Sequence, residues 1–161
     1  MSLEQLYQQV VLDHYRSPRN KGEIANPTVD IEGFNPLCGD QIHVQLLIDE
    51  NNRVKDVKFH GKGCSISQAS ASMMTQKILG KSVDEALAMR DEFKKMMEGK
   101  EVDAEALGDL VSLQGVSKFP VRIKCALLAW ASLKQGIEEY RASQNNGAPQ
   151  QTVTSKLEVH E

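Results

Sequence analysis

The sequence predicts an α+β domain in which a small three-stranded antiparallel sheet is covered by helices. Residues 41–48 alternate between apolar and polar side chains, which is typical of a strand with one buried face. A similar stretch over residues 53–61 follows the polar segment "DENN", so the two form a predicted hairpin. After Gly63 the pattern changes to helical periodicity punctuated by glycines. Strands followed by helices indicate this fold class.

The elements before the hairpin are a helix and a strand. Ser2 and Gln5 have the spacing of a capping box, and apolar residues follow at the intervals of an amphipathic helix. This helix is expected to end near Ser17 and Pro18. The segment "TVDIEGF", residues 28–34, is the predicted third strand.

Four helices are predicted after the hairpin. Three cover residues 64–80, 82–99 and 103–115, and the last begins at Pro120, a residue suited to the first helical turn. The following residues are polar, with few large apolar side chains. We therefore expect one domain over residues 1–141 and a flexible C-terminal tail over residues 142–161.

Composition restricts the classes of function. The 161 residues can form one core without disulfides, and three cysteines, an odd number, indicate reduced thiols. Nineteen Lys and Arg against 22 Asp and Glu leave a net charge of -3, which argues against nucleic acid as the main partner. No apolar run approaches the roughly 18 residues that span a bilayer, and no leader pattern begins the sequence. We expect a cytoplasmic protein without membrane contact.

Each cysteine lies at a predicted junction between elements. Cys38 ends a loop before a strand, Cys64 follows "HGKG" at a helix start, and Cys125 falls in the second turn of the last helix. The partial positive charge of a helix N-terminus stabilises a thiolate, so we expect thiolates at Cys64 and, more weakly, at Cys125. Inert packing is the alternative, because free cysteine is among the most buried residue types.

An aspartate accompanies the first cysteine in "CGD". Thiolates that converge with the Asp40 carboxylate would suit zinc, or iron within a cluster. Gly39, lacking a side chain, lets Cys38 and Asp40 turn toward one ion. The cysteines are far apart in the sequence and form no CxxC pair, so the fold must assemble any shared site.

The other chemistry-bearing residues give weaker signals. No two of His14, His43 and His60 have the spacing of metal ligands on one helix face, so they are interpreted as surface or capping residues. The segment "HGKGCS" lacks the residue spacing of a phosphate-binding loop.

Four segments carry a resemblance to a known family. The stretches "YQQVVLDHYRSPRNKG", "NPLCGDQI", "FHGKGCSISQASASMM" and "VRIKCALLAW" resemble the U-type iron-sulfur cluster assembly proteins, also called NifU-like or IscU-like. The resemblance covers about residues 3–141 and is greatest to the SufU branch. Lys124 stands where scaffold members carry a histidine, and "EVDAEALGDLVSLQG" resembles the SufU insertion.

The resemblance implies the fold of the IscU and NifU N-terminal domains and a zinc ion bound by Cys38, Asp40, Cys64 and Cys125. It also implies a sulfurtransferase that accepts persulfide sulfur on Cys38 from a SufS-type cysteine desulfurase. The sulfur would then pass to downstream iron-sulfur assembly proteins for cluster biosynthesis.

Two other functions stay open from the sequence. A scaffold could assemble a [2Fe-2S] cluster on the same three cysteines, although the missing histidine counts against it. A zinc hydrolase is a remote alternative, because three sulfurs and a carboxylate would close the tetrahedron to water.

Two basic residues lie beside the third cysteine. Arg122 and Lys124 could offset the negative charge of the site, face an acidic surface of the desulfurase, or be ordinary solvated residues.

Overall fold

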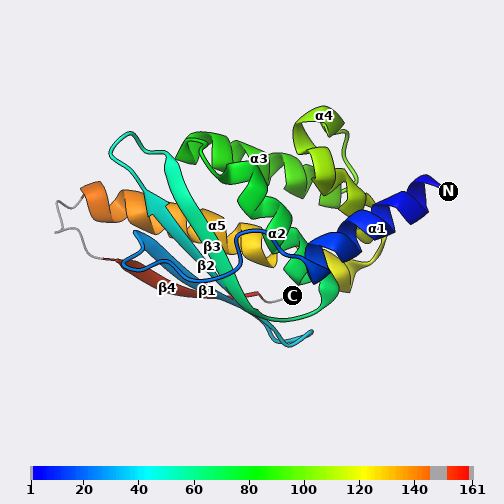
Figure 1. Cartoon of the computed structure of the whole chain (residues 1–161), viewed down its shortest axis with the longest axis horizontal. Helices are drawn as coiled ribbons and strands as arrows, with labels where there is room; N and C mark the ends of the chain where they lie inside the picture. Colours follow the sequence, from blue (N-terminus) through cyan, green and yellow to red (C-terminus); the bar gives the residue numbers. More distant parts are fainter. Residues whose placement is uncertain (1, 146–151, 160–161) are drawn as a thin grey trace.

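A four-stranded sheet and a layer of helices on one side of it make up the computed structural model, which describes residues 2–145 and 152–159 (Figure 1). In chain order the elements are α1 (Leu3–Arg16), β1 (Val29–Asn35), β2 (Asp40–Ile48), β3 (Val54–Lys62), α2 (Ser65–Ile78), α3 (Val83–Met97), α4 (Ala104–Leu107), the 3₁₀ helix η1 (Gly108–Lys118), α5 (Pro120–Asn145) and β4 (Val153–Glu158).

The predicted antiparallel strands are confirmed as β1, β2 and β3. Val44 pairs with Ile31 of β1 and Phe59 of β3, and all three side chains are buried. Successive side chains of a strand point to opposite faces, so the apolar set lies beneath the helices while polar residues such as His43 occupy the other face.

The sheet is nevertheless mixed, with the order β3-β2-β1-β4, and the prediction of three antiparallel strands was wrong in this respect. Strand β4 pairs with β1 in parallel. Its alternate residues Val153, Ser155 and Leu157 are half-buried, and Gln135 of α5 donates a hydrogen bond to Ser155. Only two of six residues in β4 are apolar, so its alternation is too weak to stand out in the sequence.

Strand β4 falls within the stretch that the sequence predicted to be a flexible tail. Residues 142–145 continue helix α5, and residues 153–158 form β4. Residues 146–151, 160 and 161, which belong to the same predicted tail, lie outside the described residues.

Helix α5 is the centre of the helical layer. It packs against the sheet on one side and against α2 and α3 on the other (Figure 1). Its Trp130 is fully buried, stacks on Phe93 with ring centroids 5.3 Å apart, and donates a hydrogen bond to Ser70 Oγ at 3.2 Å. The indole therefore buries a large apolar area without leaving its N–H unsatisfied.

The helix starts follow the predicted caps. Ser2 and Gln5 form the expected capping box, and Ser82, Asp103 and Cys64 are N-caps. Residues 103–115 differ from the prediction of one helix, because α4 stops after four residues and the chain continues as the 3₁₀ helix η1. Among the described helices, even the 26-residue α5 has no apolar stretch suited to crossing a membrane.

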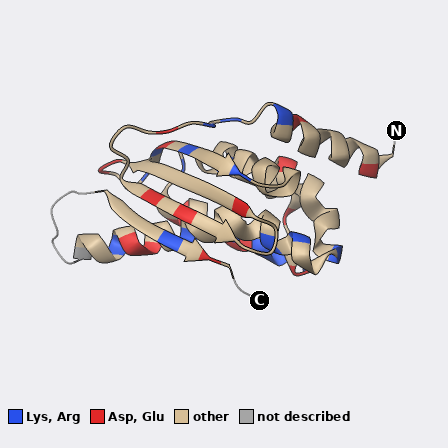
Figure 2. Ribbon diagram, turned by 90° about the horizontal axis from the view of Figure 1, so that it is seen from below, with Lys and Arg blue, Asp and Glu red and all other residues tan. Residues whose placement is uncertain are grey.

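Charged residues of both signs share the surface. In the view of Figure 2, Lys and Arg are interspersed with Asp and Glu over the sheet and the helices behind it. On this side the described Lys and Arg positions do not cluster on one element.

His14 is buried, so its interpretation as a surface or capping residue was wrong. Its Nδ1 lies 2.8 Å from Ser72 Oγ of α2, and its Nε2 lies 3.3 Å from Asp109 Oδ2 of η1. Burial lowers the pKa of His14 below its ordinary value, although the hydrogen bond to Asp109 acts in the opposite direction. The neutral imidazole thus joins three elements.

We expect the protein to lose stability as the pH falls below the ordinary histidine pKa of 6.5. The unfolded chain takes up a proton on His14 there, whereas the folded chain does so only at lower pH, so protonation favours unfolding. The free energy of unfolding by urea, measured on the reduced, zinc-free protein between about pH 7.5 and about pH 5.5, tests this.

Replacement of His14 by Gln should cost about 1–2 kcal/mol at the higher pH and flatten the pH dependence. The variant His60→Gln, at a half-buried site on the outer face of the sheet, is the matched control for the loss of an imidazole. An unchanged slope in the His14 variant would contradict the assignment.

Candidate metal centre

Three of the four predicted ligands converge at one end of the sheet. The ligand atoms of Cys38, Asp40 and Cys125 all lie within 4.8 Å of one another. The Sγ atoms of Cys38 and Cys125 are 3.1 Å apart, although their positions in the chain are distant. The fold therefore assembles the site that the sequence spacing could not show.

The turn between β1 and β2 positions the first two residues. Asn35 ends β1 and pairs with Asp40, the first residue of β2, so residues 36–39 form a tight connection that carries Cys38. Gly39 has a φ of 69°, a conformation that residues with a side chain rarely adopt. Asp40 is fully buried, while Cys38 is half-buried on the turn.

Cys64 is adjacent, but its thiol is not part of the converging group. Its backbone N–H donates a hydrogen bond to Asp40 Oδ1 at 2.9 Å, which joins the start of α2 to the converging group. Its Sγ instead caps α2 by accepting from the Ser67 N–H at 3.5 Å. Gly63 makes this close approach of the backbone possible, because a Cβ there would lie 2.6 Å from Asp40 Oδ1.

Burial dominates the electrostatics of Cys125. Its thiol has no solvent exposure, and burial raises the pKa of Cys125 well above the ordinary range, with further contributions from the neighbouring Cys38 and Asp40. The expectation that the start of α5 would stabilise a thiolate there was therefore wrong for the protein without a metal, because desolvation outweighs the helix dipole.

The donor atoms fit a thiophilic cation. Asp40 Oδ2 is buried and has no hydrogen-bond partner among the described residues. A buried carboxylate oxygen without a partner is costly, and a cation between it and the two sulfurs would remove the cost. Two sulfurs and one carboxylate, with the Cys64 thiol beside them, match the ligands that zinc prefers. They do not suit magnesium or calcium, which prefer oxygen ligands alone.

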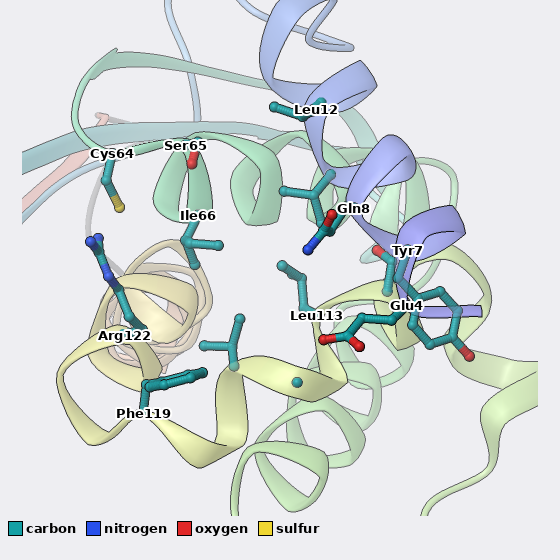
Figure 3. Close-up of a pocket in the computed structure, with 14 residues that line it drawn as sticks. Glu4, Tyr7, Gln8, Leu12, Cys64, Ser65, Ile66, Leu113, Phe119 and Arg122 are labelled. Atoms are coloured by element: carbon teal, nitrogen blue, oxygen red, sulfur yellow. The ribbon is translucent and has the colours of Figure 1, made fainter. Parts of the chain in front are cut away.

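A pocket of about 700 Å³ adjoins Cys64 (Figure 3). It lies between α1, the start of α2, η1 and the start of α5, and its walls are mostly apolar. Figure 3 shows the Cys64 thiol and the Arg122 guanidinium directed toward one another at one end of this pocket. Its lining residues come from four separate segments, so the pocket could not be predicted from the sequence.

The two basic residues near Cys125 differ in position. Arg122 is exposed, and the neighbouring Cys64, followed by Cys125, raises the pKa of Arg122 above its ordinary value. Its guanidinium can thus offset negative charge at the sulfurs. Lys124 is half-buried and forms no ion pair with another described residue.

Known proteins are similar to this chain in sequence and in fold. A zinc-dependent sulfurtransferase, SufU of Bacillus subtilis (strain 168), is 53% identical over 137 residues, which cover 84% of this chain and 92% of SufU. An iron-sulfur cluster assembly scaffold protein, IscU of Streptococcus pyogenes serotype M1, is 43% identical over 89% of both chains.

A solved structure agrees with these relatives. The iron-sulfur cluster assembly scaffold protein for the SUF system from Fervidobacterium islandicum AW-1 superimposes with a TM-score of 0.77 at 37% identity, covering 84% of this chain and 99% of that one. The model of the NifU-like N terminal domain family matches residues 6–147. The resemblance found in the four sequence segments is therefore confirmed, and the chain belongs to the NifU-like N-terminal domain family.

Proposed function

We propose that this protein is a zinc-dependent sulfurtransferase of iron-sulfur cluster assembly, with Cys38 as the sulfur acceptor. The proposal rests on the different burial and position of the Cys38 and Cys125 thiols, whose Sγ atoms are 3.1 Å apart. Cys125 is fully buried in α5, whereas Cys38 is half-buried on a four-residue turn. Of this pair, only Cys38 can move toward a partner while its neighbour stays in place.

The ligand set in this proposal is Cys38, Asp40 and Cys125, with Cys64 as the fourth member. Cys64 would contribute its thiol in place of the cap that it now provides to α2, since its backbone already contacts Asp40. When bound, zinc keeps sulfur ligands as thiolates at neutral pH and undergoes no redox change. The similarity to SufU supports this choice of metal.

The chemical step is a thiol–persulfide exchange. The Cys38 thiolate attacks the outer sulfur of a persulfide, Cys–S–SH, on the desulfurase. The new bond joins this sulfur to Cys38 Sγ, the old sulfur–sulfur bond breaks, and the desulfurase cysteine leaves as a thiolate. Cys38 then carries the persulfide, and no external oxidant or reductant is needed.

The surface around the site suits a protein partner. Leu37 beside Cys38 is 54% exposed, and Phe119 and Val121 at the start of α5 are 59% and 51% exposed. Exposed apolar groups gathered near a reactive site are typical of a docking surface. We infer that a SufS-type cysteine desulfurase docks here, with Arg122 available to acidic groups, in the reducing cytoplasm that keeps the thiols free.

A cluster scaffold is the second candidate function. The similarity to IscU scaffold proteins favours it, because IscU of Streptococcus pyogenes is 43% identical to this chain. Lys124 argues against it, since this position carries a histidine in the scaffold members that the sequence resembles, and lysine is a poor replacement as a cluster ligand.

The variant Cys38→Ala should keep much of its zinc but accept no sulfur from persulfide-loaded desulfurase. The other donors stay in place, while the acceptor sulfur is lost. Zinc content and mass spectrometry of the intact protein test this, with Cys125→Ala as the comparison that should lose zinc. Persulfide transfer to Cys38→Ala at the wild-type rate would rule out Cys38 as the acceptor.

The variant Gly63→Ala should bind zinc on the order of tenfold or more weakly, because the added methyl group would displace the Asp40 carboxylate. Gly115→Ala is the matched control, since a Cβ at that position meets no atom within 4 Å. Competition with a chromogenic chelator measures both affinities. Equal zinc affinity in the two variants would contradict the role given to Gly63.

A further inference from the structure

Asn35 is a buried amide at the metal centre that the sequence analysis did not single out. Its side chain has no solvent exposure, and its Nδ2 donates a hydrogen bond to Cys125 Sγ at 3.7 Å. Its Oδ1 has no hydrogen-bond partner among the described residues. Asn35 also pairs with Asp40 across the turn that carries Cys38, so one residue contacts the retained sulfur and closes the turn of the acceptor.

The three cysteines differ in the N–H groups that reach their sulfurs. Cys125 Sγ accepts from Asn35 Nδ2, and Cys64 Sγ accepts from the Ser67 N–H. Within residues 2–145 and 152–159, the recorded hydrogen-bond contact of Cys38 Sγ is with the Cys125 thiol, and no N–H donates to it. An N–H donor withdraws electron density from a thiolate and compensates its charge, so Cys38 carries the least moderated sulfur of the three.

The burial of the Asn35 amide has a free-energy cost that packing alone does not explain. An apolar side chain of similar volume, such as leucine, would avoid the cost of a buried, half-satisfied amide. The one hydrogen bond that the Asn35 side chain makes to another described residue is directed at a sulfur of the site. Its chemistry is therefore matched to an anionic sulfur rather than to packing.

We propose that Asn35 is a positioning residue that holds Cys125 as the retained sulfur ligand and so leaves Cys38 as the sulfur that departs to accept the persulfide. The inference rests on the proposed function in two respects, namely that Cys125 binds the metal and that Cys38 accepts the persulfide. Asn35 acts through Cys125 and does not itself touch the transferred sulfur.

Cobalt(II) in place of zinc gives a readout that is independent of sulfur transfer. In wild-type protein, intense ligand-field bands report a tetrahedral site, and sulfur-to-cobalt charge-transfer bands report its thiolates. In Asn35→Leu the charge-transfer bands should move to lower energy, because the sulfur loses its N–H donor, while the ligand-field bands persist. Zinc affinity, measured by chelator competition, should fall about 10- to 100-fold.

Two further variants complete the test. Asn35→Asp keeps the size of the side chain but removes the N–H donor, so it should show the same loss of zinc affinity. It serves as the test if Asn35→Leu does not fold. Gln41→Leu is the matched control, because its amide lies near Asp40 but donates to Glu32 on the other face of the sheet. It should keep the wild-type spectrum and zinc affinity.

The outcomes distinguish failure of the role given to Asn35 from failure of the proposed function. Unchanged charge-transfer energy and zinc affinity in folded Asn35→Leu or Asn35→Asp would overturn the role of Asn35 and leave the sulfurtransferase intact. Absence of sulfur-to-cobalt bands in the wild-type protein would overturn both, because Cys125 would then not bind the metal.

Discussion

One part-buried hydrogen bond, from the Cys64 N–H to Asp40 Oδ1, connects the two parts of the site. Asp40 begins β2, and Cys64 caps α2, so this contact fixes the end of the sheet against the start of a helix. A fully buried carboxylate is costly unless its oxygens are satisfied. The second Asp40 oxygen has no partner among the described residues, which leaves it available to a cation. The site thus depends on a carboxylate that the fold buries and only half satisfies.

The sulfurs around this carboxylate lie on different kinds of element. Cys125 lies inside the longest helix, which packs on the sheet, and Cys38 lies on the turn between two strands. Since a helix side chain is held by its neighbours on every side, whereas a turn can shift without disturbing the core, the same site can both retain a metal and release a sulfur. Stable binding and transfer chemistry are therefore assigned to separate elements.

Much of this arrangement could be predicted from the sequence because it follows from periodicity. Alternation predicted β2 and β3, and the four ligands that the family resemblance implies include three residues whose ligand atoms converge, Cys38, Asp40 and Cys125. Their binding of a metal stays a prediction. The direction of the Cys64 thiol could not be predicted, since it depends on one side-chain torsion. His14 and strand β4 were missed because their surroundings come from segments far away in the chain.

We propose that zinc bound by Cys38, Asp40, Cys64 and Cys125 enables Cys38 to take sulfur from a desulfurase. The most direct measurement is the turnover of a SufS-type cysteine desulfurase with this protein, either zinc-loaded or zinc-depleted, in the absence of added iron. We expect the zinc-loaded form to stimulate desulfurase turnover strongly and the zinc-depleted form to stimulate it little. Equal turnover with the two forms, or no stimulation by either, would contradict it and favour the scaffold function.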